Sequence, residues 1–193
     1  MKKVLILLSN GFEVYEAAAF IDVLGWANTF GSEKIEIVTA GFHLKLDCTF
    51  GFQAVPVVQT DQLDLNAFDA LAIPGGFETA GFYEDGYSEE FLNIIRYFDE
   101  MNKPIASICV GALLLGKSGV LANRSATTYH LLEGKRRIQL AEMGATVLDK
   151  SVVVDENIIT SSSPATALDV AFLLLERLTS KENKNKIKVL MGF

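Results

Sequence analysis

Short apolar runs alternate with amphipathic stretches along this chain. Val4–Leu8, Ala70–Ile73 and Pro104–Ile108 are nearly unbroken apolar runs, which are typical of parallel strands buried on both faces. Ile35–Ala40 predicts another strand. The amphipathic stretches predict helices over Val14–Phe30, Ser88–Met101, Leu131–Met143 and Pro164–Leu178, and a further helix that opens with Val110–Leu115. Strands that alternate with helices indicate an α/β fold with a mostly parallel sheet covered on both faces.

The other segments predict smaller features. Leu44–Val58 alternates in polarity around Gly51 and Pro56 and predicts a hairpin excursion, and Ser125–Thr128 predicts a short extended segment. A second hairpin is expected over 152–160, with its turn at 155–157. Lys181–Lys188 is highly charged, and we expect a solvated surface segment there. We find no repeat or linker, so residues 1–193 predict a single domain.

Composition narrows the class of protein. Half of the 193 residues are hydrophobic, which is enough for one buried core, and the net charge is −7. This acidic surplus argues against nucleic-acid and anionic-membrane partners, and no stretch reaches the ~20 apolar residues of a membrane helix. We interpret Met1–Leu8 as leading into a strand rather than as an export signal. Cys48 and Cys109 are then expected to be free thiols in a cytoplasmic protein.

Three loops are the expected location of a ligand site. Ligands of open parallel sheets bind at the carboxyl ends of the strands. The loops that follow the predicted strands there are Ser9–Glu16, Pro74–Gly81 and Cys109–Gly111. The chemistry of this protein is therefore expected where these three loops meet.

Cys109 has the surroundings of a nucleophile on a sharp strand-to-helix turn. Ser107 stands two residues before it and Gly111 two residues after it, and small residues at these positions allow the tight turn of a nucleophile elbow. The sulfur would lie at a helix N-terminus, which favours thiolate and predicts a lowered pKa. The alternative is an unreactive cysteine buried in the core. Gly75 and Gly76 favour the functional interpretation, because a backbone N–H there and that of Val110 could form an oxyanion hole.

Glu16 and two histidines are the other candidates for catalysis. Glu16 precedes three alanines at the start of the first helix, and an apolar setting beside a thiolate would raise its pKa and let it donate a hydrogen bond to the sulfur. The alternative is an acid that merely suits the helix dipole. Glu13 is interpreted as a surface charge. His130 could approach Cys109 as a base or lie at the surface, and His43 has no evident partner. Two separated histidines argue against a zinc site, and we expect no metal or other cofactor.

One motif match is rejected. Gly111–Ser118 fits the phosphate-loop pattern G-x-x-x-x-G-K-[ST]. That loop must open a long helix at its Lys-Ser pair, whereas Gly119–Asn123 carries no helical pattern. We therefore expect Gly111–Ser118 to be the interior of the helix after the elbow.

Four segments together resemble the ThiJ/PfpI superfamily, and most closely its branch of the parkinsonism-associated protein deglycase. They are Asn10–Glu16, Ile73–Gly76, Ile108–Gly111 and Thr160–Thr166. The resemblance covers nearly the whole chain. It implies a flavodoxin-like three-layer sandwich in one class I glutamine amidotransferase-like domain, and a homodimer, for which the Ala-rich first helix offers a contact surface.

The resemblance also implies roles for individual residues. Cys109 would be the nucleophile or an oxidisable thiol, Glu16 its protonated partner, and the N–H groups of Gly76 and Val110 would surround the reacting oxygen. The residues that would surround and support these groups are Gly75, Tyr129 and Pro164. Members called peptidases carry His directly after the nucleophile, where this chain has Val110, which argues against an intracellular peptidase.

Members called glyoxalases or deglycases place His where this chain has Tyr129. His130 is one residue away and should point to the opposite face. The leading hypothesis is a glyoxalase or deglycase-type hydrolase or lyase acting on small reactive carbonyls through Cys109 and Glu16. The alternatives are a redox-sensing stress-response protein in which Cys109 oxidises to a sulfinate, and a binding domain without catalysis.

Overall fold

A seven-stranded sheet forms the centre of the molecule. The computed structural model describes all 193 residues, and the strand order is β10-β11-β7-β6-β1-β2-β5. All neighbours pair in parallel except β10 and β11. The strands are β1 (Lys2–Leu7), β2 (Ile35–Gly41), β5 (Val58–Gln59), β6 (Ala70–Ile73), β7 (Ile105–Ser107), β10 (Val152–Asp155) and β11 (Ile158–Ser161). The mostly parallel sheet expected from the apolar runs is confirmed.

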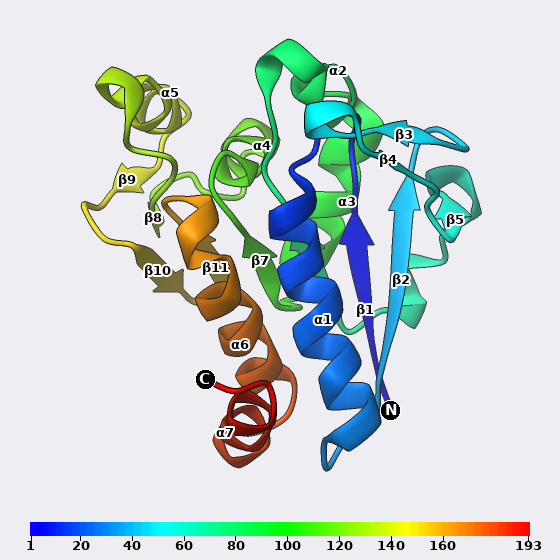
Figure 1. Ribbon diagram of the computed structural model, residues 1–193. Helices are drawn as coiled ribbons and strands as arrows, with labels where there is room; N and C mark the ends of the chain where they lie inside the picture. The colour runs from blue at the N-terminus through cyan, green and yellow to red at the C-terminus, as the bar shows by residue number, and fades with distance from the viewer.

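Helices cover both faces of this sheet (Figure 1). On the face toward the viewer, α1 (Val14–Phe30) contacts α6 (Ala167–Leu178), and α7 (Lys181–Leu190) packs against both. On the other face, α3 (Glu89–Glu100) contacts α4 (Gly111–Ser118). The shorter helices are α2 (Phe82–Gly86) and α5 (Lys135–Glu142). The three-layer sandwich is confirmed, and because Gly111–Ser118 is helical throughout, so is the rejection of the phosphate-loop match.

Two short strand pairs flank the main sheet. One is formed by β3 (Leu46–Asp47) and β4 (Gln53–Ala54), which confirms the first predicted hairpin excursion, and the other by β8 (Ser125–Ala126) and β9 (Thr146–Val147). Single 3₁₀ turns lie at Thr49–Gly51, Thr60–Gln62, Leu65–Ala67, Glu78–Ala80, Leu132–Gly134 and Pro164–Thr166. The antiparallel pair β10–β11 confirms the second hairpin.

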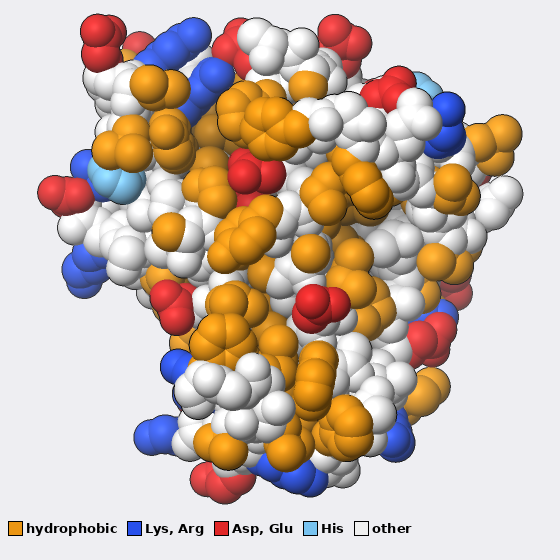
Figure 2. All heavy atoms as spheres, viewed as in Figure 1, with side chains coloured by type: hydrophobic (Ala, Val, Ile, Leu, Met, Phe, Trp, Pro, Cys, Tyr) orange, Lys and Arg blue, Asp and Glu red, His pale blue; other side chains and the backbone are white.

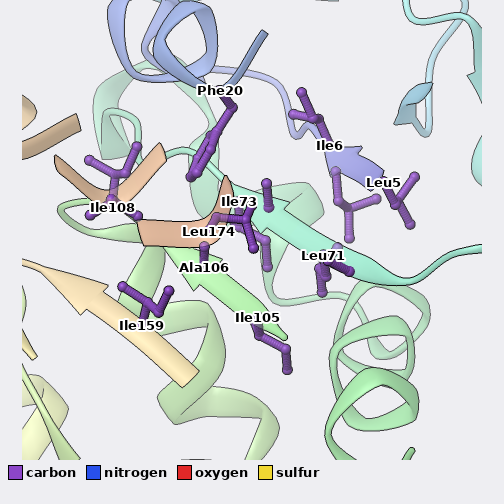
Figure 3. Packing of buried hydrophobic residues seen from close by; sticks show 14 of the residues in the cluster. Leu5, Ile6, Phe20, Leu71, Ile73, Ile105, Ala106, Ile108, Ile159 and Leu174 are labelled. Atoms are coloured by element: carbon purple, nitrogen blue, oxygen red, sulfur yellow. The ribbon is translucent and has the colours of Figure 1, made fainter. Parts of the chain in front are cut away.

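The core lies on both faces of the central strands. Leu5, Ile73 and Ile105 are fully buried, which is why their strands read as continuous apolar runs. Figure 3 shows Phe20 of α1 and Leu174 of α6 packed over these strands. Each such side chain contributes roughly 1.5–3 kcal/mol when it is buried. This packing holds the carboxyl ends of β1, β6 and β7 in fixed positions.

Two predicted segments differ from the structure. The helix expected from Leu131 begins only at Lys135, because Leu132, Glu133 and Gly134 all have positive φ angles. The expected solvated segment over 181–188 is instead the helix α7. Its N-cap is Ser180, whose hydroxyl accepts from the Asn183 N–H, and Ile187 is fully buried. No helix of the structure is long and apolar enough to cross a membrane.

Candidate active site

Cys109 lies on a sharp turn between β7 and α4. Its φ angle is +54°, an uncommon value for a residue other than glycine, and α4 begins two residues later at Gly111. A side chain at Gly111 would lie only 3.1 Å from the carbonyl oxygens of Ile73 and Pro74. Glycine therefore lets the elbow pack closely against the end of β6, where a side chain would press on the backbone. The predicted nucleophile elbow is confirmed.

Glu16 is buried beneath the elbow. The residue is fully inaccessible to solvent in the first turn of α1, and its Oε2 accepts a hydrogen bond of 2.5 Å from the Gly75 N–H. Its Oε1 is buried without a hydrogen-bond partner. Burial raises the pKa of Glu16 to about 8, although the Gly75 N–H favours the carboxylate. Glu16 is therefore mostly protonated at neutral pH, as expected from the sequence.

The Cys109 thiol and the Glu16 carboxyl influence each other. Burial raises the pKa of Cys109, the nearby Glu16 raises it further, and the N–H of Val110 acts in the opposite direction by hydrogen-bonding the sulfur. The prediction of a lowered pKa was wrong, because burial in a 6% exposed position outweighs the helix N-terminus. The two groups form a coupled pair, so the protonation state of each affects the pKa of the other.

Gly76 presents a free backbone donor next to this pair. Its N–H donates to no protein group, because the flanking bonds run from Glu13 N to Gly75 O and from Phe77 N to Gly11 O. A side chain at Gly76 would lie 2.3 Å from the Gly11 oxygen, so only glycine fits this crossing. Gly76 and Cys109 line the same cavity. The Gly76 N–H is therefore available to a reacting oxygen.

A cavity of about 330 Å³ opens above Cys109. Tyr129 lines it, because the Thr128 hydroxyl donates to the Cys109 carbonyl at 2.9 Å and holds this segment beside the elbow. His130 is exposed and does not line the cavity. The expectation that His130 approaches Cys109 is therefore not met. The cavity is lined by Glu13, Gly76, Phe77, Glu78, Cys109, Val110, Tyr129, Leu131, Leu132, Lys135 and Arg136.

Several cavity residues were missed by the sequence analysis. Glu13 is not a plain surface charge: it lines the cavity, and partial burial raises its pKa. Lys135 and Arg136 enter from α5, and their only signal in the sequence was a run of basic residues. Pro164 begins a 3₁₀ turn after β11 and does not line the cavity. Gly75 supports the site through Glu16, as expected.

The remaining candidates lie outside the cavity. His43 is 3.0 Å from Asp85, and Cys48 is a buried free thiol whose pKa burial raises to about 11. The structure contains no group of three or more His, Cys, Asp or Glu side chains arranged to hold a metal ion.

The fold and the site define an α/β protein with a thiol on a nucleophile elbow and a buried carboxyl beside it. The chain belongs to the DJ-1/PfpI family, whose model matches residues 2–177. This confirms the resemblance found in the sequence.

The relatives include proteins described as enzymes. The glutathione-independent glyoxalase DJ-1 of Schizosaccharomyces pombe is 34% identical over 97% of this chain and 96% of its own length. A deglycase of Thermococcus kodakarensis is 31% identical over 84% of this chain and 90% of its own. The chain spans only 39% of the length of DJ-1 homolog B of Arabidopsis thaliana, to which it is 29% identical. The crystal structure of Drosophila melanogaster DJ-1beta covers 98% of this chain, and 97% of its own chain is matched, with a TM-score of 0.86 and 29% identity.

Proposed function

We propose that this protein is a cysteine-dependent enzyme of the glyoxalase and deglycase type, which converts small α-oxoaldehydes to 2-hydroxy acids. The observation that carries this proposal is the pairing of Cys109, at a cavity, with a buried carboxyl whose pKa is about 8. A nucleophile beside an acid–base group that can change its charge near neutral pH suits covalent catalysis. The relatives named as a glyoxalase and a deglycase support the same class of reaction.

The reaction needs no outside oxidant. The Cys109 sulfur forms a bond to the aldehyde carbon, and the carbonyl oxygen takes a proton, which gives a hemithioacetal. A proton then moves from that carbon to the neighbouring ketone carbon by way of an enediol, which leaves a thioester. Water cleaves the thioester and releases the 2-hydroxy acid and the thiol. One carbon is oxidised, its neighbour is reduced, and one water is consumed.

Three residues in and behind the cavity have different roles in this reaction. Glu16 carries the proton between the two carbons, because its carboxyl lies beside the sulfur and exchanges its proton near pH 8. The free N–H of Gly76 stabilises the developing oxyanion. The Tyr129 hydroxyl, in the place of an imidazole, acts as a hydrogen-bond donor to the substrate.

Lactate formation from methylglyoxal tests the proposal. We expect the purified protein to produce lactate in step with methylglyoxal loss, measured by enantiomer-resolved chromatography. Alkylation of the protein with iodoacetamide beforehand is expected to stop this production, since the sulfur can then form no hemithioacetal. Methylglyoxal loss without any lactate would contradict the proposal, because it would reflect simple adduct formation with protein side chains.

A second function is favoured by the tyrosine at position 129. No histidine lines the cavity, so the site can hold an oxidised sulfur without an imidazole base. Peroxide would convert the Cys109 thiol to a sulfinate in two steps, each of which transfers one oxygen atom and releases one water. Below about pH 8 the protonated Glu16 can donate a hydrogen bond to a sulfinate oxygen. Such a protein would signal oxidative stress rather than turn over a carbonyl.

Mild peroxide treatment tests this second function. We expect peptide mass spectrometry to find two added oxygen atoms on Cys109 before any on Cys48, because Cys109 lines the cavity that peroxide can enter and Cys48 does not. Oxidation of Cys48 while Cys109 stays reduced would rule the redox function out.

The homodimer and the cytoplasmic location stay predictions. Figure 2 shows hydrophobic side chains spread over the face formed by α1 and α6. On α1 the exposed ones are Tyr15, Ile21, Trp26 and Phe30, and we propose this surface for contact between two subunits.

A further inference from the structure

The cavity above Cys109 has two chemically different ends. The inner end holds the thiol and the Gly76 N–H, and the walls are formed by apolar side chains that include Phe77 and Leu131. Lys135 and Arg136, the first two residues of α5, supply the positive charges of the cavity. A small carbonyl compound needs only the inner end. The cationic groups are therefore unexplained by the proposed reaction.

Arg136 is held firmly in its place. Its side chain is 18% exposed, and it donates to Glu78 at 2.7 Å and to Gln139 at 3.0 Å. The guanidinium also lies over the ring of Tyr83, 5.3 Å from the ring centre. These contacts fix the planar group at the cavity with further N–H donors to spare. Arg136 is thus preorganised to bind a planar oxyanion.

The charge pattern of α5 runs against the usual preference of helices. Acidic side chains suit the first turn, yet α5 begins with Lys135, Arg136 and Arg137 and has no acid there. The N-terminus of α5 also has no side-chain cap. A helix arranged for stability alone would place these charges elsewhere.

A carboxylate of the protein itself already forms an ion pair with Arg136. Glu78 reaches Arg136 from the loop after β6, on the other side of the cavity, and lies 3.8 Å from Lys135. Its side chain is 57% exposed, and the two cations hold its pKa below the usual range. An exposed carboxylate on a short turn can be displaced at little cost. Glu13, the other acid at the cavity, is partly buried and has no ion-pair partner in the structure.

We propose that Arg136 and Lys135 bind a carboxylate on the substrate, so that the enzyme prefers α-oxoaldehydes whose far end is anionic. The substrate carboxylate replaces Glu78 at Arg136, and its aliphatic spacer lies along Phe77, Leu131 and Leu132 while the aldehyde meets Cys109. This inference rests on the proposed function for the reaction at Cys109. The recognition itself can be measured without turnover.

A matched pair of substrates tests the preference. 4,5-Dioxopentanoate is an α-oxoaldehyde with a carboxylate two methylenes away, and its methyl ester is the neutral control. We expect kcat/KM for the acid to exceed that for the ester about tenfold, which is typical of a hydrogen-bonded charge pair. The products are 2-hydroxyglutarate and its monomethyl ester. Arg136→Met should lower the acid-to-ester ratio about tenfold, and Glu78→Gln should raise it.

A labelling experiment reads the same preference without catalysis. 3-Maleimidopropionate and its methyl ester are compared for the rate at which they modify Cys109 at pH 8.5, measured by peptide mass spectrometry. The acid-to-ester ratio should follow the same order, Glu78→Gln above wild type and wild type above Arg136→Met. Arg137→Met is the matched control, because Arg137 pairs with exposed Asp149 and does not line the cavity. It should keep the wild-type ratio.

The two experiments separate the failure of each proposal. If the labelling ratio follows Arg136 but no 2-hydroxy acid forms, the carboxylate site stands and the proposed reaction is wrong. If 2-hydroxy acids form but both ratios stay near one in the wild type, or fall equally in Arg137→Met, the carboxylate site is wrong. If neither maleimide labels Cys109, because its thiol stays protonated at pH 8.5, the kcat/KM ratio of acid to ester decides alone, and a wild-type ratio near one overturns the site.

Discussion

Replacing Cys109 by alanine is expected to abolish the formation of lactate from methylglyoxal, lowering kcat/KM at least about 10³-fold. The reason is that Cys109 is the group on the elbow that faces the cavity and can form the covalent intermediate. The oxyanion donor at Gly76 remains in the variant, so any residual rate reports what that donor achieves alone. The measurement is initial-rate kinetics with detection of lactate.

Cys48→Ala is the matched control for this variant. Cys48 is also a buried free thiol, but it lies outside the cavity. We expect it to keep wild-type kcat/KM. Thermal unfolding of both variants would verify that they fold, since each change removes only one sulfur atom from the core. Lactate production at the wild-type rate by Cys109→Ala would remove this residue from the reaction.

Much of the fold could be predicted because its central elements are decided locally. β1, β6 and β7 are buried on both faces, so nearly every residue in them must be apolar, and a short apolar run is a clear signal. The elbow was equally clear, because Ser107 and Gly111 are the small residues that a sharp turn demands. Glu16 was found because the topology places the starts of helices at the same edge of the sheet.

The cavity could be predicted only in part, because its outer wall depends on backbone conformations that the residue types do not indicate. Leu132 and Glu133 adopt positive φ angles, which neither residue type favours. This turn delays the start of α5 and thereby brings Lys135 and Arg136 to the cavity. A helix begun at Leu131, as predicted, would have placed the two basic side chains differently.

The charge state of Cys109 could not be predicted from the sequence, for a different reason. A helix N-terminus lowers a thiol pKa, and the sequence places one directly after Cys109. Burial raises the pKa, and its extent depends on α1, on the glycine loop and on Glu16, which lies far away in the sequence. The balance of the two effects is a property of the packed molecule. The helix α7, with its N-cap at Ser180 and its buried Ile187, was not predicted for a similar reason, since the surrounding residues are charged.

Glu16→Gln is expected to lower kcat/KM for methylglyoxal roughly 10²–10³-fold while the protein stays folded. The amide oxygen of Gln can still accept the hydrogen bond from Gly75, so the loop keeps its support. What is lost is the ability to take a proton from the substrate carbon. Glu16→Asp, which keeps the acid but shortens it, serves as the comparison and should retain more of the pH dependence than Glu16→Gln.

The pH profile distinguishes this proton-transfer role from a purely structural one. Because the Glu16 pKa is about 8, wild-type kcat/KM should rise with pH through about 8, as the carboxylate becomes available as a base. Glu16→Gln should lack this rise. A Gln variant with the wild-type profile would show that another group provides the base.

The stability of the wild type should depend on pH with the opposite sign to its catalysis, whereas Glu16→Gln should lack this dependence. The Glu16 pKa is 4.5 in the unfolded chain and about 8 in the folded protein, so folding takes up a proton between these values. Wild-type stability should therefore fall as pH rises through this window, by on the order of 5 kcal/mol once the buried carboxyl is ionised. Glu16→Gln removes this cost, so its free energy of unfolding should exceed that of the wild type above pH 8.

Urea unfolding of both proteins at pH 5.5 and pH 9 measures the difference. Parallel changes in both proteins would mean that Glu16 is already ionised at neutral pH, and the same carboxyl could then not supply the pH-dependent step of the reaction.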